Sequence, residues 1–163
     1  IDDLTKIYNR RHFFSILDEK IDVARQLNKS FYLVLFDIDA FKEINDHFGH
    51  TWGDQVIMAV AQTVKNRMRE GSFVGRFGGD EFMIIIDQAK EEDFYTRINA
   101  ISLAIRELDF LIEGRKVKVS ASFGAALFDP FKVNTSKELI EMADSTLLNV
   151  KRFRKGEISL GKA

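Results

Sequence analysis

The sequence has no cysteine and very little proline, and both absences limit what the chain can be. Without cysteine there are no disulfides, thiolate zinc sites or cysteine nucleophiles, which is compatible with a reducing compartment. One proline and ten glycines among 163 residues leave no low-complexity linker. We therefore expect helices and strands to follow one another closely.

An excess of charge and long apolar runs are also missing. Lys and Arg (24) nearly balance Asp and Glu (25), so no overall field attracts nucleic acid or an anionic membrane. No stretch approaches about 18 apolar residues, and the N-terminus lacks a signal-peptide pattern. We expect a cytoplasmic domain, including the cytoplasmic part of a membrane-anchored protein, with no nucleic acid and no membrane contact.

The composition fits one globular domain. With 163 residues, of which 45% are hydrophobic, the chain can bury a sufficient core, and we assign residues 1–163 to a single domain. The sequence begins with Ile1 rather than methionine and enters an amphipathic segment at once. This favours excision from a longer protein with an N-terminal sensory or regulatory region.

Hydrophobic periodicity predicts alternating helices and strands. Helices are expected over 9–26, 40–48, 52 or 54–69, 91–108 and 136–153, and strands over 31–39, 74–77, 82–86, 116–128 and near 158. Ser136 is the expected N-cap of the last helix. Because one adjacent pair of strands reads as a hairpin, the fold class is α+β. We expect a mixed central β-sheet with a ferredoxin-like, palm-type βαββαβ core and additions, covered by helices.

The hairpin carries an unusual tip in the stretch "RFGGDEFMIII" (76–86). Gly78 and Gly79 are expected to supply the positive φ angles of a two-residue turn. That explains the glycines but not Asp80 and Glu81, which directly precede a buried strand. An exposed hairpin with solvated acids is the simplest alternative for this motif alone.

A second pair of acids, Asp37 and Asp39, ends the first predicted strand. In a βαββαβ sheet this strand can lie beside the hairpin, so the two acidic pairs can converge, which like charges tolerate around a cation. Carboxylate oxygens without cysteine favour Mg²⁺ or Mn²⁺, and two such ions per active site serve nucleotidyl transfer. Taken alone, Asp37 and Asp39 are equally explained as a helix cap and a solvated residue.

Residues beside the acids suit a nucleotide. The glycine pair lets a nucleotide approach the backbone closely, and Lys42 follows the strand where helix amides and an ammonium can hold a triphosphate. His47 and His50 are more simply explained as polar surface residues.

Together these motifs resemble a known family. "DIDAFKEINDHFGHTWGD" (37–54), "RFGGDEF" (76–82), "DDLTKIYNRRHF" near the start, "SASFGAA" (120–126) and "MADSTLLNVKRFRKG" in the last helix are similar, in order, to the GGDEF domains of diguanylate cyclases. The resemblance implies condensation of two GTP into cyclic di-GMP and pyrophosphate by a homodimer.

The resemblance also implies roles for individual residues. Metal binding falls to Asp37, the carbonyl of Ile38, Asp80 and Glu81, with Asp80 and Glu81 as the catalytic acids and Asp80 helping to deprotonate the attacking 3′-hydroxyl. Substrate binding falls to Phe41, Lys42, Asn45, His50, Asp54, Gly78, Gly79, Lys151 and Lys155. Asn45 and Asp54 would read the guanine edge, because Asp54 accepts from two donors that adenine lacks.

Three positions depart from the family pattern. The product-inhibition motif Arg-x-x-Asp reads Arg69, Glu70, Gly71, Ser72, so its aspartate is missing and feedback should be weak; Arg69 is otherwise a cation at a helix end. Lys155 stands where an arginine normally binds phosphate, and a lysine lacks the bidentate fork. Lys6 replaces a common glycine.

A second function from another class stays open. The altered last helix is also compatible with a catalytically weak GTP-binding domain that regulates an attached or partner module, and the basic residues there can simply complement a helix C-terminus. A generic nucleotide-binding domain would show no preference between GTP and ATP.

Overall fold

The computed structural model describes residues 1–87, 90–132, 135–153 and 158–161. In chain order the elements are α1 (Arg10–Leu27), β1 (Phe31–Ile38), α2 (Phe41–Phe48), α3 (His50–Lys65), β2 (Phe73–Gly78), β3 (Glu81–Ile86), α4 (Glu91–Arg106), β4 (Phe110–Ile112), β5 (Arg115–Val117), β6 (Ala121–Phe128), α5 (Ser136–Phe153) and β7 (Ile158–Gly161). Within these residues, no helix is both long enough and apolar enough to cross a membrane.

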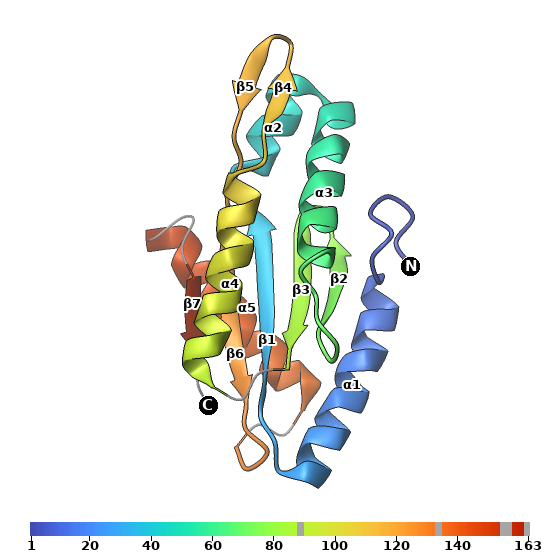
Figure 1. Cartoon of the computed structure of the whole chain (residues 1–163), viewed down its shortest axis with the longest axis vertical. Coiled ribbons are helices and arrows are strands. Elements are labelled where there is room, and N and C mark those ends of the chain that lie inside the picture. The colour runs from blue at the N-terminus through green and yellow to red at the C-terminus, as the bar shows by residue number, and fades with distance from the viewer. Residues whose placement is uncertain (88–89, 133–134, 154–157, 162–163) are drawn as a thin grey trace.

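Five strands form a mixed sheet in the order β2-β3-β1-β6-β7. β1 lies between β3 and β6 and is antiparallel to both, whereas β7 is parallel to β6. The order β6-β1-β3-β2 is that of a ferredoxin-like βαββαβ core. Helices α3 and α4 cover one face of the sheet, and α5 lies behind it (Figure 1). The predicted fold class is confirmed.

The two faces of β1 supply two separate cores. Every residue of β1 is buried, because helices cover both sides of the sheet. Tyr32 and Val34 belong to the core under α3 and α4, and Leu33 and Leu35 to the core under α1 and α5. Since side chains alternate along a strand, Asp37 falls on the α1 and α5 face.

The predicted strand over 116–128 is two strands. β5 ends at Val117 and pairs with β4, which the sequence pattern did not predict, in a separate two-stranded sheet. Gly114, at φ +78°, lies in the turn between them. This hairpin projects beyond the end of the central sheet, beside α2 (Figure 1). The alternation of Val117 and Val119 therefore spans a break, and β6 begins only at Ala121.

The long central helix begins and ends earlier than predicted. Gly49, at φ +90°, ends α2 and immediately precedes α3, so α3 starts at His50 rather than at residue 52 or 54. The helix ends at Lys65. Arg69 therefore lies four residues beyond the helix rather than in its last turn.

α5 begins at Ser136 as predicted, but its capping residue lies one position earlier. The backbone N–H of Glu138 donates to the Thr135 hydroxyl at 3.1 Å, so Thr135 caps the helix and Ser136 is its first residue. The prediction of Ser136 as the N-cap was wrong, because adjacent Thr and Ser are equivalent caps by sequence.

One glycine sets the distance between α5 and the sheet. A Cβ at Gly124 of β6 would lie 2.3 Å from the backbone nitrogen of Leu147 and 2.5 Å from the carbonyl oxygen of Ala143. Both are backbone atoms of α5, which cannot yield as a flexible side chain would. Helix and strand therefore meet at backbone contact here.

Candidate active site

Asp37 and Glu81 are brought together by strand register. They are directly opposed in the pairing of β1 with β3, so the two predicted acidic pairs meet at one end of the sheet. The Asp37 carboxylate is buried and forms an ion pair with Lys151 of α5 through its Oδ2 atom. Its Oδ1 atom is also buried and has no hydrogen-bond partner among the described residues. A ligand atom is thus available inside the protein.

Asp39 has a different environment from Asp37. Its two carboxylate oxygens accept hydrogen bonds from the hydroxyls of Ser120 and Ser122, each at 2.6 Å. Its backbone N–H donates to the Ser120 carbonyl oxygen. These bonds join the end of β1 to the start of β6, so Asp39 fixes the strand ends while Asp37 remains available. The alternation of serines in "SAS" was the sequence signal for this clamp.

The turn between β2 and β3 differs from the prediction. Gly78 is opposite Glu81 in the ladder, so the two turn residues are Gly79 and Asp80. Gly79 alone of the glycine pair has positive φ, at +51°. A Cβ on either glycine would meet no atom within 4 Å, so neither is required for packing. The glycines leave an open backbone beside Asp80, as a close-approaching ligand requires.

The acids at this end perturb one another. Burial raises the pKa of Asp37 to about 6; Lys151 opposes this rise, and the negative charges of Asp80 and Asp39 add to it. Partial burial raises the pKa of Glu81, and so do the charges of Asp80 and Asp144. Lys151 and Arg10 act on Glu81 in the opposite direction. The site carries negative charge in excess of its own cations, which favours an added cation.

The donor set fits a hard divalent cation only with help from the substrate. Within the described part of the chain, no three His, Asp or Glu side chains gather closely enough to hold a metal by themselves. Asp37 offers an unpartnered oxygen, and Asp80 and the Ile38 carbonyl are of the same hard oxygen type. Mg²⁺ commonly takes one or two carboxylates and completes its shell with water and phosphates.

The residues expected to read a base lie together between α2 and α3. Gly53 is buried under the Asn45 side chain: a Cβ on Gly53 would lie 1.8 Å from Asn45 Oδ1 and 3.2 Å from the Phe41 ring. Asn45 Oδ1 is buried without a hydrogen-bond partner in the described residues. Asp54, next to Gly53, is exposed. The helix pair thus brings the two predicted base-reading residues, Asn45 and Asp54, near the predicted substrate residue Phe41.

The other predicted substrate residues are placed less tightly. Lys42 on α2 and His50 at the start of α3 are exposed. Lys151 lies on α5 against Asp37, and Lys155 lies outside the described residues. Sequence reasoning missed Arg10 and Asp144, whose charges act on Glu81. Both stand in the segments "NRRH" and "MADS", but neither segment alone indicates that it reaches the hairpin.

Arg69 of the degenerate Arg-x-x-Asp motif lines a small cleft, here called the arginine cleft. It has a volume of about 270 Å³ and is lined by Asn66, Arg67, Met68, Arg69, Arg97, Ala100 and Ile101. Arg97 Nη1 donates to the buried Ser72 hydroxyl at 3.2 Å, whereas its Nη2 is buried without a partner in the described residues. Burial and the charge of Arg69 lower the pKa of Arg97. The missing aspartate leaves two arginines close together.

The geometry can now be compared with known proteins. A family model described as "Diguanylate cyclase, GGDEF domain" matches residues 1–157. The chain belongs to the GGDEF domain family. It is 32% identical to diguanylate cyclase DosC of Escherichia coli K12, over the whole chain but only 35% of DosC. It is 33% identical, over 93% of the chain, to the probable diguanylate cyclase DgcC of that organism and covers 40% of that protein.

Solved GGDEF structures share the fold closely. Diguanylate cyclase SiaD of Pseudomonas aeruginosa, crystallised with its activator SiaC, gives a TM-score of 0.93 at 28% identity, over 98% of this chain and 61% of that one. The GGDEF domain of DgcB from Caulobacter crescentus, in complex with c-di-GMP, gives 0.91 at 28% identity, over 98% and 94%. The GGDEF assignment made from sequence is confirmed.

Proposed function

We propose that this GGDEF domain is a cyclase, and that it condenses two GTP into cyclic di-GMP and pyrophosphate as one half of a homodimer. The observation that carries the proposal is the pairing of Asp37 with Glu81 beside Asp80, with one buried Asp37 oxygen that has no hydrogen-bond partner in the described part of the chain. The family supports the enzyme class. Because the chain spans about a third of DosC, we propose it as the catalytic domain of a longer, cytoplasmic protein with an upstream regulatory region.

Each residue has a proposed task in the reaction. Asp37, the Ile38 carbonyl, Asp80 and Glu81 would hold two Mg²⁺ or Mn²⁺ ions, which when bound neutralise phosphate charge and polarise the attacking hydroxyl. Lys42 and Lys151 bind phosphate oxygens, Lys155 being proposed for the same task. Phe41, Asn45 and Asp54 hold guanine, and His50 contacts the substrate.

The bond changes balance across the two-fold axis. The 3′-oxygen of one GTP attacks the α-phosphorus of the other, and the bond to the β-phosphate breaks to release pyrophosphate. Asp80 takes the hydroxyl proton at its carboxylate. The same step in the opposite direction closes the ring. The open turn at Gly78 and Gly79 leaves room for this approach.

The decisive experiment incubates the purified protein with GTP and Mg²⁺ and measures pyrophosphate and cyclic di-GMP. Two pyrophosphates released per cyclic di-GMP formed, with a specific activity that rises with protein concentration, support a dimeric cyclase. GTP hydrolysis without cyclic product contradicts it.

One observation favours a second candidate, a catalytically weak GTP-binding domain. Lys151 forms an ion pair with Asp37, the proposed metal ligand, so that one carboxylate oxygen is already engaged and not available to a metal ion. If that contact persists with GTP bound, the domain binds GTP without turning it over and acts on a partner instead. Calorimetric GTP binding in the absence of pyrophosphate release would support this candidate.

A further inference from the structure

The tip of the β2–β3 hairpin is not held by the strand ladder alone. β2 is an edge strand, and its register with β3 shifts between Arg76 and Gly78, so Phe77 is an extra residue in β2. Bulges of this kind bend a strand and redirect the residues that follow. The position of Asp80 therefore depends on contacts outside the ladder.

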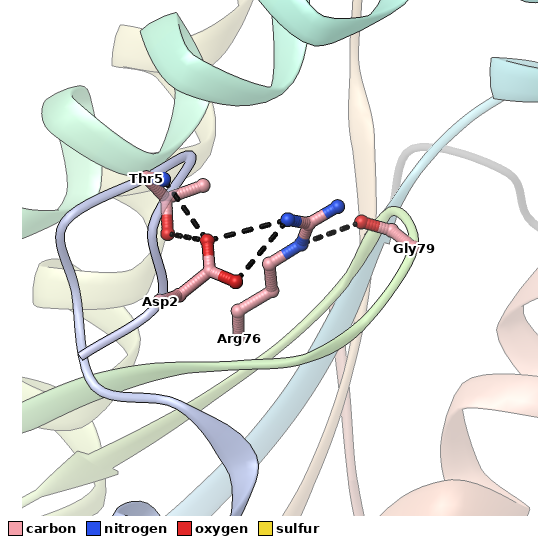
Figure 2. A network of polar contacts seen from close by, with 4 residues as sticks. All are labelled: Asp2, Thr5, Arg76 and Gly79. Carbon is pink, nitrogen blue, oxygen red and sulfur yellow. Dashed lines mark hydrogen bonds and ion pairs between the residues drawn. The ribbon is translucent and has the colours of Figure 1, made fainter.

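Arg76 supplies such a contact (Figure 2). Its Nε donates to the carbonyl oxygen of Gly79, the residue before Asp80, at 2.9 Å. Its Nη1 donates to both carboxylate oxygens of Asp2, at 3.3 and 3.2 Å. Only about a sixth of the side chain, 17%, is exposed. One guanidinium thus joins the hairpin turn to the start of the chain, using the planar set of donors that arginine alone provides.

Asp2 is itself held in place. Thr5 donates to Asp2 Oδ2 from its backbone N–H at 2.9 Å and from its hydroxyl at 2.6 Å. Burial alone would raise the pKa of Asp2, but the Thr5 bonds and the Arg76 charge outweigh it, and the pKa is lowered. Asp2 therefore stays ionised at neutral pH, as the ion pair with Arg76 requires.

The whole N-terminal turn is tied to β2 beside this contact. Two backbone bonds, from Asp2 N–H to the Ile7 carbonyl and from Lys6 N–H to the Asp2 carbonyl, close the turn over residues 2–7. The backbone N–H of Arg76 then donates to the Tyr8 carbonyl at 2.8 Å. Lys6 has φ +61°, the region that a glycine would adopt more easily.

We propose that Arg76 is a positioning residue. It fixes the turn that carries Asp80 through its bond to Gly79, and it makes the position of that turn depend on the N-terminal turn through its ion pair with Asp2. The proposal rests on the proposed function. A displacement of residues 2–7 moves the Asp2 carboxylate, and through Arg76 it moves the carbonyl of the residue before Asp80. Because catalytic geometry is sensitive to about 1 Å, such a movement changes turnover more than substrate binding.

A purely structural role is the competing explanation. An ion pair between two chain segments could simply add stability, in which case its loss would lower the unfolding midpoint and leave the order of the turn unchanged. The two explanations differ in what happens at Gly79 and Asp80 in the folded protein, which is measurable without any catalysis.

The first experiment measures backbone ¹⁵N relaxation at Gly79 and Asp80 in the whole chain. In the unsubstituted protein we expect order parameters near the rigid value of about 0.85, and in Arg76→Ala and Asp2→Asn values below about 0.6 at these two residues. Gly53 in α3 should not change. Turn order parameters that are unaffected by either substitution would overturn the proposal.

Arg76→Lys separates the two contacts. A single ammonium can keep the ion pair with Asp2 but cannot also present a donor to Gly79 in the same plane. We expect the order of residues 2–7 to be kept and that of Gly79 to be lost. If Arg76→Lys preserves both, the fork of the guanidinium is not what holds the turn, and the proposal fails.

The second experiment compares kcat with KM for GTP. Arg76→Ala should lower kcat roughly 10- to 100-fold, with KM changed less than about twofold. Arg106→Ala, which removes an exposed arginine from α4, controls for charge, and the core substitution Ile105→Val controls for lost stability. Equal losses of kcat in Arg76→Ala and Ile105→Val would contradict a positioning role.

The two experiments fail separately. If the unsubstituted protein makes no cyclic di-GMP but Gly79 loosens in Asp2→Asn, the proposed function is wrong and the mechanical link stands. If the protein is active and Gly79 is indifferent to Asp2 and Arg76, the link is wrong and the proposed function stands.

Discussion

The acidic end of the sheet and the arginine cleft are opposites built on the same pattern. Each has an excess of charge of one sign, and in each one buried side-chain atom has no hydrogen-bond partner among the described residues: Asp37 Oδ1 in the first and Arg97 Nη2 in the second. The acidic end lies beside an open glycine turn, whereas Arg97 of the arginine cleft donates to the buried hydroxyl of Ser72. Excess charge therefore favours a ligand where an open backbone lets one approach, as at the glycine turn.

The largest expected effect separates the two regions by activity. Asp80→Ala should lower kcat by roughly 10³-fold, because it removes both a proposed metal ligand and the proton acceptor. Arg69→Ala, in the arginine cleft, should leave kcat within about twofold. Assays of cyclic di-GMP formation measure both, and thermal unfolding should show both proteins folded, since neither side chain belongs to the core. Full turnover by Asp80→Ala would show that the acidic end does not take part in the reaction.

The second prediction tests the proposal that Asp54 recognises the base. Asp54→Ala should reduce the preference for GTP over ATP by about 100-fold, because the carboxylate accepts from guanine donors that adenine lacks. Apparent Mg²⁺ activation should change little. Competition assays with the two nucleotides measure the preference; if ATP is still rejected as strongly, Asp54 does not recognise the base.

The third prediction converts the arginine cleft toward the usual motif. Cyclic di-GMP should bind the unsubstituted protein weakly, and Ser72→Asp should tighten binding about tenfold, because it gives Arg97 an ionised partner and offers the ligand an acceptor. Isothermal titration calorimetry checks both values. Tight binding to the unsubstituted protein, abolished by Arg69→Ala, would show that the missing aspartate is not needed.

The smallest expected effect concerns the free-energy cost of ionising the buried Asp37 carboxyl group. The folded pKa of about 6 lies above the usual 3.8, so the folded protein resists ionisation and the penalty is complete only above about pH 6. The rise from 3.8 to about 6 is worth up to about 3 kcal/mol, so Asp37→Asn should stabilise the metal-free protein by about 1 to 3 kcal/mol near pH 7.5, with the gain vanishing below pH 3.8. Urea unfolding across this range measures it.

The matched control for this prediction lies in the arginine cleft. Arg97→Met removes Arg97 Nη2, which is buried without a partner among the described residues. Because an arginine does not titrate over the tested range of about pH 4 to 8, the effect of this substitution should be independent of pH. If the change in the free energy of unfolding caused by Asp37→Asn were also independent of pH, burial would not disfavour the ionised form of Asp37.

The sequence was sufficient for the sheet, because patterns local to each element determined it. The apolar runs over 31–39 and 82–86 predicted two buried strands, and the βαββαβ order made them neighbours. The limits of the elements were less certain. Gly49 both ends α2 and precedes α3. Val117 and Val119 continue an alternating pattern past the end of β5, so the pattern hides the gap between β5 and β6.

The candidate site was predictable only as far as residue identity reaches. Asp37 and Glu81 follow from strand order, but the ion pair of Asp37 with Lys151 depends on how closely α5 packs. Asp39 and Asp37 look alike in sequence, and only the two serine hydroxyls distinguish them. The link from Asp2 to Arg76 joins residues 74 positions apart, which no local pattern reveals.

Gly124 makes the acidic end vulnerable from a distance. A single added methyl there would push the backbone of α5 away from the sheet. Lys151, one turn beyond Leu147 on the same helix, would then move away from Asp37 and lose the ion pair. An engineer who wished to silence this domain without touching a charged residue could begin with that hydrogen atom.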